Sequence, residues 1–130
     1  REKAIWRAAG IDYEEVRRAP WYIESGRGMG PTLLMASEKE AYTLTDIGTF
    51  LAYRGKLDLV PLVERGRMLL NVYSAIAVNP RRHPKVNFPM AQNLIRFLLS
   101  EEVQRLIGNY GLEEYGRPLF IPCAGRELEE

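Results

Sequence analysis

Residues 21–36 read WYIESGRGMGPTLLMA and carry the strongest local signal in the chain. Trp21, Tyr22 and Ile23 form a short run of aromatic and β-branched residues, which predicts a strand. In the turn that follows, glycine alternates with other residues, and Pro31 stands where a helix would place its first residue. The stretch therefore predicts a strand, a glycine-rich turn and a helix, the local unit of an α/β fold.

Strand-like and helix-like segments alternate along the rest of the chain. Apolar runs predict strands over residues 41–44, 57–63 and 69–78, and helical spacing predicts helices over residues 3–9, 45–55, 88–98 and 100–108. The run LLNVYSAIAV at 69–78 is almost wholly apolar, which is typical of a strand buried on both faces of a sheet. We therefore expect an α/β fold with a mixed sheet flanked by helices.

Composition argues against several classes of function. The 18 Lys and Arg residues are interleaved with 17 Asp and Glu residues, so the sequence has no basic stripe that would indicate a nucleic-acid partner. No apolar run reaches the roughly 20 residues needed to span a bilayer. The single cysteine, Cys123, and the single histidine, His83, do not form a usual structural zinc set or a nucleophile with its base. We therefore expect no catalytic residues, no cofactor and no metal ion.

The glycine-rich turn is the first candidate binding site. Glycines allow the backbone to approach a ligand closely, and the first free amides of a helix favour an anion. Gly28, Met29, Gly30 and Thr32 would line such a site, whereas Pro31 has no N–H to donate. The pattern fits equally well a turn with only a structural role. It lacks the Gly-Lys-Ser/Thr ending and the distant acidic residue of nucleotide-binding motifs, so we do not expect a nucleotide ligand.

A second candidate site lies at residues 42–46, which read YTLTD. Ligands of open α/β sheets collect at the carboxyl ends of strands, so the hydroxyl groups of Tyr42 and Thr43 could donate to an oxyanion. Tyr42 could equally be a core aromatic residue. A carboxylate would repel an anion, and Asp46 is therefore assigned to capping the next helix.

Longer segments of the chain resemble the tungstate-binding proteins of ABC importers, a branch of the type II periplasmic binding proteins close to the molybdate-binding proteins. The most specific pieces are GMGPTL followed by AYTLTD, the segment AVNPRRHP and the closing GRPLFIP. The resemblance covers nearly the whole chain. It implies two α/β lobes, with the oxyanion held in the cleft between them by backbone amides and hydroxyl groups. The positions that it assigns to oxyanion binding are Gly28, Met29, Gly30, Thr32, Tyr42 and Thr43.

The resemblance also implies which part of the family fold is present. The family's Thr- and Ser-rich N-terminal loop and its Arg-Gly-Asp-Asp-Ser-Gly-Thr-like stretch do not occur in this sequence. We therefore expect about the C-terminal half of a family member, with an incomplete first lobe. Residues 1–75 would form the second, ligand-binding lobe, and residues 76–130 would form a crossing strand and the helices that return to the first lobe.

An incomplete first lobe would leave the helical region at residues 88–108 without its usual packing partner. Large apolar patches are seldom left exposed, so we expect either self-association or pairing with a separate polypeptide that supplies the first lobe.

The function implied by the resemblance is the capture of tungstate or molybdate for an ABC transporter permease, at the periplasmic or extracellular face of the membrane. A signal peptide would then lie upstream of this sequence. The alternative is an oxyanion-sensing regulatory module of the same fold, and an enzyme of a related fold ranks last. Tungstate and molybdate have nearly the same size and charge, so the sequence does not decide between them.

Overall fold

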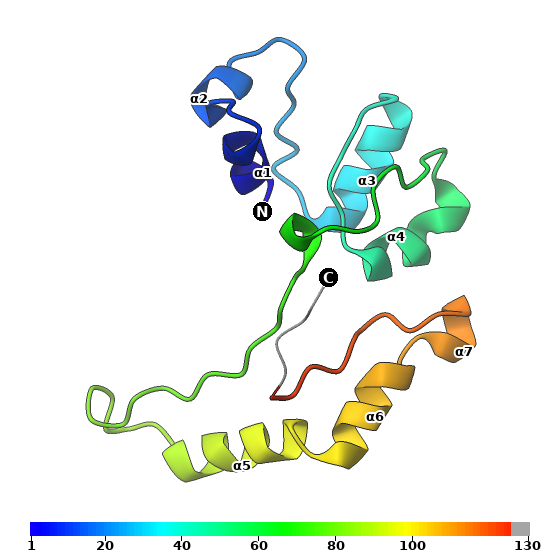
Figure 1. The fold of residues 1–130 in the computed structure, drawn as a ribbon. Helices are drawn as coiled ribbons and strands as arrows, with labels where there is room; N and C mark the ends of the chain where they lie inside the picture. The colour runs from blue at the N-terminus through cyan, green and yellow to red at the C-terminus, as the bar shows by residue number, and fades with distance from the viewer. Residues whose placement is uncertain (126–130) are drawn as a thin grey trace. The chain divides into compact units, whose positions relative to one another are not determined.

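The computed structural model describes residues 1–125, which form short helices joined by irregular and extended segments (Figure 1). The helices are α1 (Glu2–Ala8), α2 (Tyr13–Val16), α3 (Met29–Glu38), α4 (Ile47–Tyr53), α5 (Phe88–Leu98), α6 (Glu101–Asn109) and α7 (Leu112–Tyr115), with 3-10 turns η1 (Arg54–Lys56) and η2 (Arg67–Leu69). The chain divides into two compact units, Arg1–Leu70 and Asn71–Glu130. Within the described residues, no helix is both long enough and apolar enough to cross a membrane.

Side-chain caps explain where several helices begin, and they confirm the helices predicted near residues 45–55, 88–98 and 100–108. Asp46 accepts a hydrogen bond from the Thr49 amide at 2.8 Å, and the Ser100 side chain accepts a longer one, 3.5 Å, from the Val103 amide. Such caps satisfy amides that have no partner inside the helix. The first predicted helix also forms, and Gly10 follows it with a positive φ of 75°.

The helix after the glycine-rich turn begins earlier than predicted. Helix α3 starts at Met29 rather than at Pro31, so the proline is the third helical residue. The amides of the first helical turn have no acceptor within the helix, so a proline there removes no helical hydrogen bond. Pro31 was therefore a correct marker of the first turn but not of its first residue.

The predicted mixed sheet is not confirmed, because residues 1–125 contain no strand. The runs at 21–23, 41–44, 57–63 and 70–78 are not helical, and Leu69 belongs to the turn η2. A strand exists only where its N–H and C=O groups pair with those of a neighbour. Among the described residues, no backbone hydrogen bond joins any of these runs to another. The apolar pattern therefore identified extended segments, but in the described part of the chain no other extended segment pairs with them.

Helix α3 lies at the centre of the small core of the first unit. The buried apolar side chains are Val16, Leu33, Ala36 and Phe50, and Leu33 on α3 is only 1 % exposed. Helix α4 packs against α3 and contributes Phe50. Because burial of apolar surface is the main favourable term in folding, α3 holds the glycine-rich turn in place by anchoring the residues that follow it.

We predict that Leu33→Ala lowers the free energy of unfolding of the first unit by about 2–4 kcal/mol, because it leaves a cavity in a small core. Trp6 and Trp21 both lie in this unit, with ring centroids 6.1 Å apart, so tryptophan fluorescence during urea unfolding reports its stability. Leu62→Ala is the matched control, since Leu62 is 68 % exposed. Equal effects of the two substitutions would contradict the assignment of Leu33 to the core.

Candidate functional site

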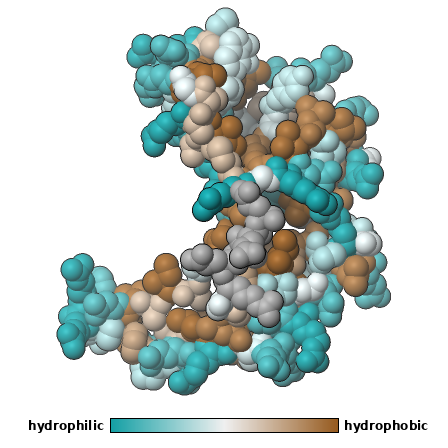
Figure 2. Space-filling view, viewed as in Figure 1, coloured by the Kyte–Doolittle hydropathy of each residue, from teal (hydrophilic) through white to brown (hydrophobic). Residues whose placement is uncertain are grey.

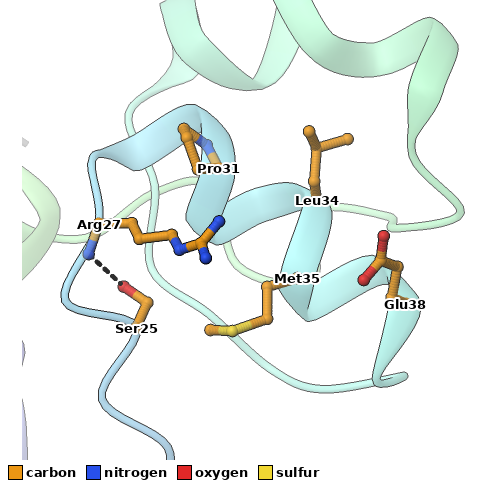
Figure 3. A pocket seen from close by; sticks show the side chains of 6 residues that line it. All are labelled: Ser25, Arg27, Pro31, Leu34, Met35 and Glu38. Carbon is orange, nitrogen blue, oxygen red and sulfur yellow. Dashed lines mark hydrogen bonds between the residues drawn. The ribbon is translucent and has the colours of Figure 1, made fainter.

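A chain of hydrogen bonds closes the glycine-rich turn onto the first turn of α3. The Arg27 amide donates to Ser25 Oγ at 3.3 Å (Figure 3). Ser25 Oγ lies 2.7 Å from Thr32 Oγ1. Thr32 Oγ1 in turn donates to the carbonyl oxygen of Gly28 at 2.9 Å. Since the Thr32 proton goes to that carbonyl, the Ser25 proton is the one shared with Thr32.

The start of α3 leaves backbone donors free beside this turn. The Thr32 amide bonds to the Gly28 carbonyl oxygen at 3.0 Å. The amides of Met29 and Gly30 have no hydrogen-bond partner among residues 1–125. Amides at a helix N-terminus carry a partial positive charge and are suited to binding an anion. Within the turn, the hydrogen-bond donors available to an oxyanion are therefore chiefly backbone amides.

The two glycines at the start of α3 are required for different reasons. Gly30 is buried, and a Cβ atom placed there would overlap the ring of Tyr53 on α4. Gly28 has a φ of −68°, and a Cβ atom there would meet nothing within 4 Å. Gly30 is thus a packing residue, whatever its amide binds. Gly28 leaves open space in which a ligand can approach the backbone.

We predict that Gly30→Ala destabilises the first unit by about 1–3 kcal/mol through overpacking against the Tyr53 ring. Gly28→Ala is the matched control and should change stability by less than about 0.5 kcal/mol. Urea unfolding measures both, and a double-mutant cycle with Tyr53→Ala identifies the clash. An undiminished cost of Gly30→Ala in the Tyr53→Ala background would contradict this explanation.

The second predicted pair of site residues is on the surface. Tyr42 is 90 % exposed, so it is not a core aromatic residue within this chain. Thr43 is also exposed. The segment that follows α3 returns toward the end at which that helix begins (Figure 1). No hydrogen bond among the described residues connects Tyr42 or Thr43 to the glycine-rich turn. Both hydroxyl groups are therefore unengaged, and the structure does not join them to the turn.

The predicted capping role of Asp46 is confirmed. Its carboxylate accepts from the Thr49 amide at 2.8 Å and from the Thr49 hydroxyl at 2.7 Å. Partial burial acts to raise the pKa of Asp46, but the hydrogen bonds from Thr49 outweigh it and the pKa lies below its ordinary value. The carboxylate therefore stays ionised and turned toward its own helix, α4.

We predict that Asp46→Ala lowers the free energy of unfolding by about 1 kcal/mol at pH 7, the usual cost of losing a cap. Because the folded pKa is lowered, the contribution is full above the unfolded value of about 3.9 and is lost as pH falls through the folded pKa. Urea unfolding of the wild type and the variant between pH 7 and pH 2 should thus show the difference shrinking with acid. Asp58→Ala serves as the exposed control; a pH-independent difference for Asp46→Ala would contradict the ionised cap.

An open hollow lies along one side of α3 (Figure 3). Its lining residues are Ser25, Arg27, Pro31, Leu34, Met35 and Glu38. Three of these six residues are apolar, and the negative charge of Glu38 opposes the positive charge of Arg27. The free amides at the start of α3 are therefore a better anion site than the hollow.

Sequence reasoning did not select Ser25 or Arg27. Arg27 places a positive charge inside the turn, between Gly26 and Gly28. Ser25 holds the turn to α3 through Thr32. The position of Ser25 shortly before a helix could have indicated its role in the turn, because serine side chains commonly form hydrogen bonds to nearby groups in turns. Within residues 1–125, no group of His, Cys, Asp and Glu side chains is suited to hold a metal ion.

Comparisons with known proteins agree with a binding role. Residues 1–102 match the family model described as a PBP superfamily domain. The tungstate-binding protein TupA of Peptoclostridium acidaminophilum is 42 % identical over 126 residues, which is 97 % of this chain and 43 % of that protein. A putative ABC transporter anion-binding protein of Haloferax volcanii is 42 % identical over 129 residues, covering 95 % of this chain and 36 % of that protein.

A solved structure agrees with these sequence comparisons. The tungstate-binding protein TupA from Desulfovibrio alaskensis G20 has a TM-score of 0.73 and 38 % sequence identity, with 95 % of this chain and 49 % of that chain covered. The chain spans less than half the length of the curated relatives it matches.

Proposed function

The chain belongs to the PBP superfamily, and on this premise we propose that it captures tungstate or molybdate as part of the substrate-binding component of an ABC transporter. The observation that carries the proposal is the 42 % identity with a tungstate-binding protein over 97 % of the chain. That match spans nearly the whole chain, and the turn before α3 offers unpaired backbone amides. The ligand is thus a small oxyanion, and binding involves no chemical step.

The amides of Met29 and Gly30 are the main donors to the oxyanion in this proposal, and the open space at Gly28 allows the anion to reach them. Neutral donors in a fixed arrangement suit a dehydrated dianion, because they replace its water shell without bringing a mobile countercharge. Thr32 contributes chiefly by holding the turn, since its proton already goes to the Gly28 carbonyl oxygen.

Tyr42 and Thr43 complete the proposed set of donors in an interlobe cleft. Their hydroxyl groups are exposed and have no partner among the described residues, so they are free to bond to an anion. Arg27 adds a positive charge inside the turn. Its guanidinium group would raise the local concentration of anions and strengthen binding at low salt.

The proposal places the protein at the periplasmic or extracellular face of the membrane, with an ABC transporter permease as the partner that receives the anion. This is supported by the Haloferax volcanii relative, a putative ABC transporter anion-binding protein.

We predict saturable binding of tungstate or molybdate and weaker binding of sulfate. Tyr42→Phe should weaken binding about tenfold or more, since a hydrogen bond to a charged group contributes about 1.5–3 kcal/mol. Thr32→Val should also weaken it, because it removes the hydrogen bonds to Ser25 and to the Gly28 carbonyl oxygen that hold the turn. Isothermal titration calorimetry measures these affinities. Tyr110→Phe is the matched control, because it also removes an exposed tyrosine hydroxyl but lies in the other unit.

The titrations need two forms of the protein, because the chain spans less than half of its relatives. One is the chain by itself. The other is a chimera in which this chain replaces the matched region of the Peptoclostridium acidaminophilum protein. Absence of heat with every anion in a folded chimera would overturn the proposed function, as would equal affinity for sulfate.

A further inference from the structure

Arg27 carries the formal charge of the glycine-rich turn, because the other residues of SGRGMG at 25–30 are uncharged. Its amide donates to Ser25 Oγ at 3.3 Å, which anchors its backbone to the turn. Among residues 1–125, its guanidinium group forms no hydrogen bond, ion pair or ring contact. The side chain is exposed and extends alongside α3 (Figure 3). The turn therefore holds a cation that no described protein group neutralises by direct contact.

The acidic residues that flank the turn are engaged or distant. Glu24 precedes the turn, and its carboxylate accepts a hydrogen bond from the Tyr13 hydroxyl at 2.7 Å. Glu38 lines the same hollow as Arg27, but it ends α3, about 13 Å along the helix axis from Met29. The first turn of α3 contains no acidic residue. Along the chain, Arg27 is thus the charged residue next to the free amides at the start of α3.

The side chain of Arg27 has room to move toward these amides. A Cβ atom at Gly26 or at Gly28 would meet nothing within 4 Å, so the space on both sides of Arg27 is open. Only Gly28 separates Arg27 from Met29, whose amide has no partner in the described part of the chain. Exposed side chains change rotamer within nanoseconds. The guanidinium group is therefore able to approach an anion bound at the start of the helix.

Neutral amides and a formal cation select a ligand by different properties. Hydrogen bonds to amides are short and directional, so they depend mainly on where the oxygen atoms of the ligand lie. The energy of a formal charge reaches further and is proportional to the charge of the ligand. Amides alone therefore discriminate weakly between two tetrahedral oxyanions of the same shape, whereas a cation beside them favours the anion with the larger charge.

We propose that Arg27 is a specificity-determining residue that selects doubly charged tetrahedral oxyanions over singly charged ones of the same shape. This role rests on the proposed function, since it concerns the same site at the start of α3. It adds selection by charge to whatever selection by size the site provides. Arg27 acts through its charge and not through a fixed hydrogen bond, because its guanidinium group has no fixed contact among residues 1–125.

Tungstate and perrhenate test this role, because both anions are tetrahedral and of nearly equal size, but tungstate is a dianion and perrhenate a monoanion. Calorimetric titration of the chimera with tungstate, followed by displacement with perrhenate, gives the two affinities. Arg27→Gln removes the charge of the side chain. It should weaken tungstate binding about tenfold and perrhenate binding about threefold, because the Coulomb energy of a monoanion is half that of a dianion.

Two further variants separate charge from structure. Arg27→Lys keeps the charge and should hold both affinities within about twofold of wild type. Hydrophilic residues are scattered over the visible face of the first unit (Figure 2), so an exposed arginine outside the turn is a suitable control. Arg18 is such a residue, and Arg18→Gln should change both affinities by less than about twofold, because solvent and salt screen a distant exposed charge.

Ionic strength supplies a second readout. Raising the salt concentration from about 0.01 M to about 1 M should weaken tungstate binding more in wild type than in Arg27→Gln, because salt screens an exposed charge. Equal salt dependence, equal weakening of the two anions by Arg27→Gln, or a loss in Arg27→Lys as large as in Arg27→Gln would overturn the role of Arg27 and leave the proposed function intact. A folded wild-type chimera that binds neither tungstate nor molybdate would overturn both.

Discussion

The close approach of α3 to the Tyr53 ring of α4 is the contact on which the first unit depends. Gly30 makes the approach feasible because it has no Cβ atom to overlap the ring. With the helices this close, Leu33 and Phe50 are buried in the core. The turn before α3 is then held at a packed helix, and hydrogen bonds among Ser25, Thr32 and the Gly28 carbonyl oxygen fix its shape. A core of few residues thereby presents free amides in a defined place, the preorganisation that tight anion binding requires.

The second unit illustrates the opposite condition, in which local structure forms without a core. Helices α5 and α6 have good caps, yet no apolar side chain among the described residues beyond Leu70 is fully buried. The Gln104 side chain accepts from the Ala124 amide at 3.3 Å and donates to the Leu98 carbonyl oxygen at 2.8 Å, which ties the segment after α7 to α6. Such contacts hold neighbouring segments together but bury little apolar surface. Helical boundaries can thus be set locally while burial depends on partners far away in the fold.

The candidate site was predicted only in part, for identifiable reasons. The turn at Gly28–Thr32 could be found because its glycines, its proline and the apolar residues after it are adjacent in sequence. The capping role of Asp46 followed from the same local logic and was confirmed. That Gly30 serves packing could not be predicted, because its neighbour Tyr53 lies more than twenty residues away and approaches it only in the folded unit. The assignment of Tyr42 and Thr43 to the oxyanion stays a prediction.

The sequence by itself determined the family, the start and end of most helices, and the position of the extended apolar runs. These features depend on residues close together along the chain: caps, glycines, prolines and hydrophobic spacing. Only the tertiary structure decided that, among residues 1–125, no backbone hydrogen bond joins the runs at 57–63 and 70–78 to another run, and that the Thr32 hydroxyl is engaged in the turn. The reason is that a strand forms only when two backbone segments pair, and a hydrogen-bond donor is free only when no acceptor lies near it in the folded structure. Both depend on residues far away in the sequence, so the local sequence does not predict them.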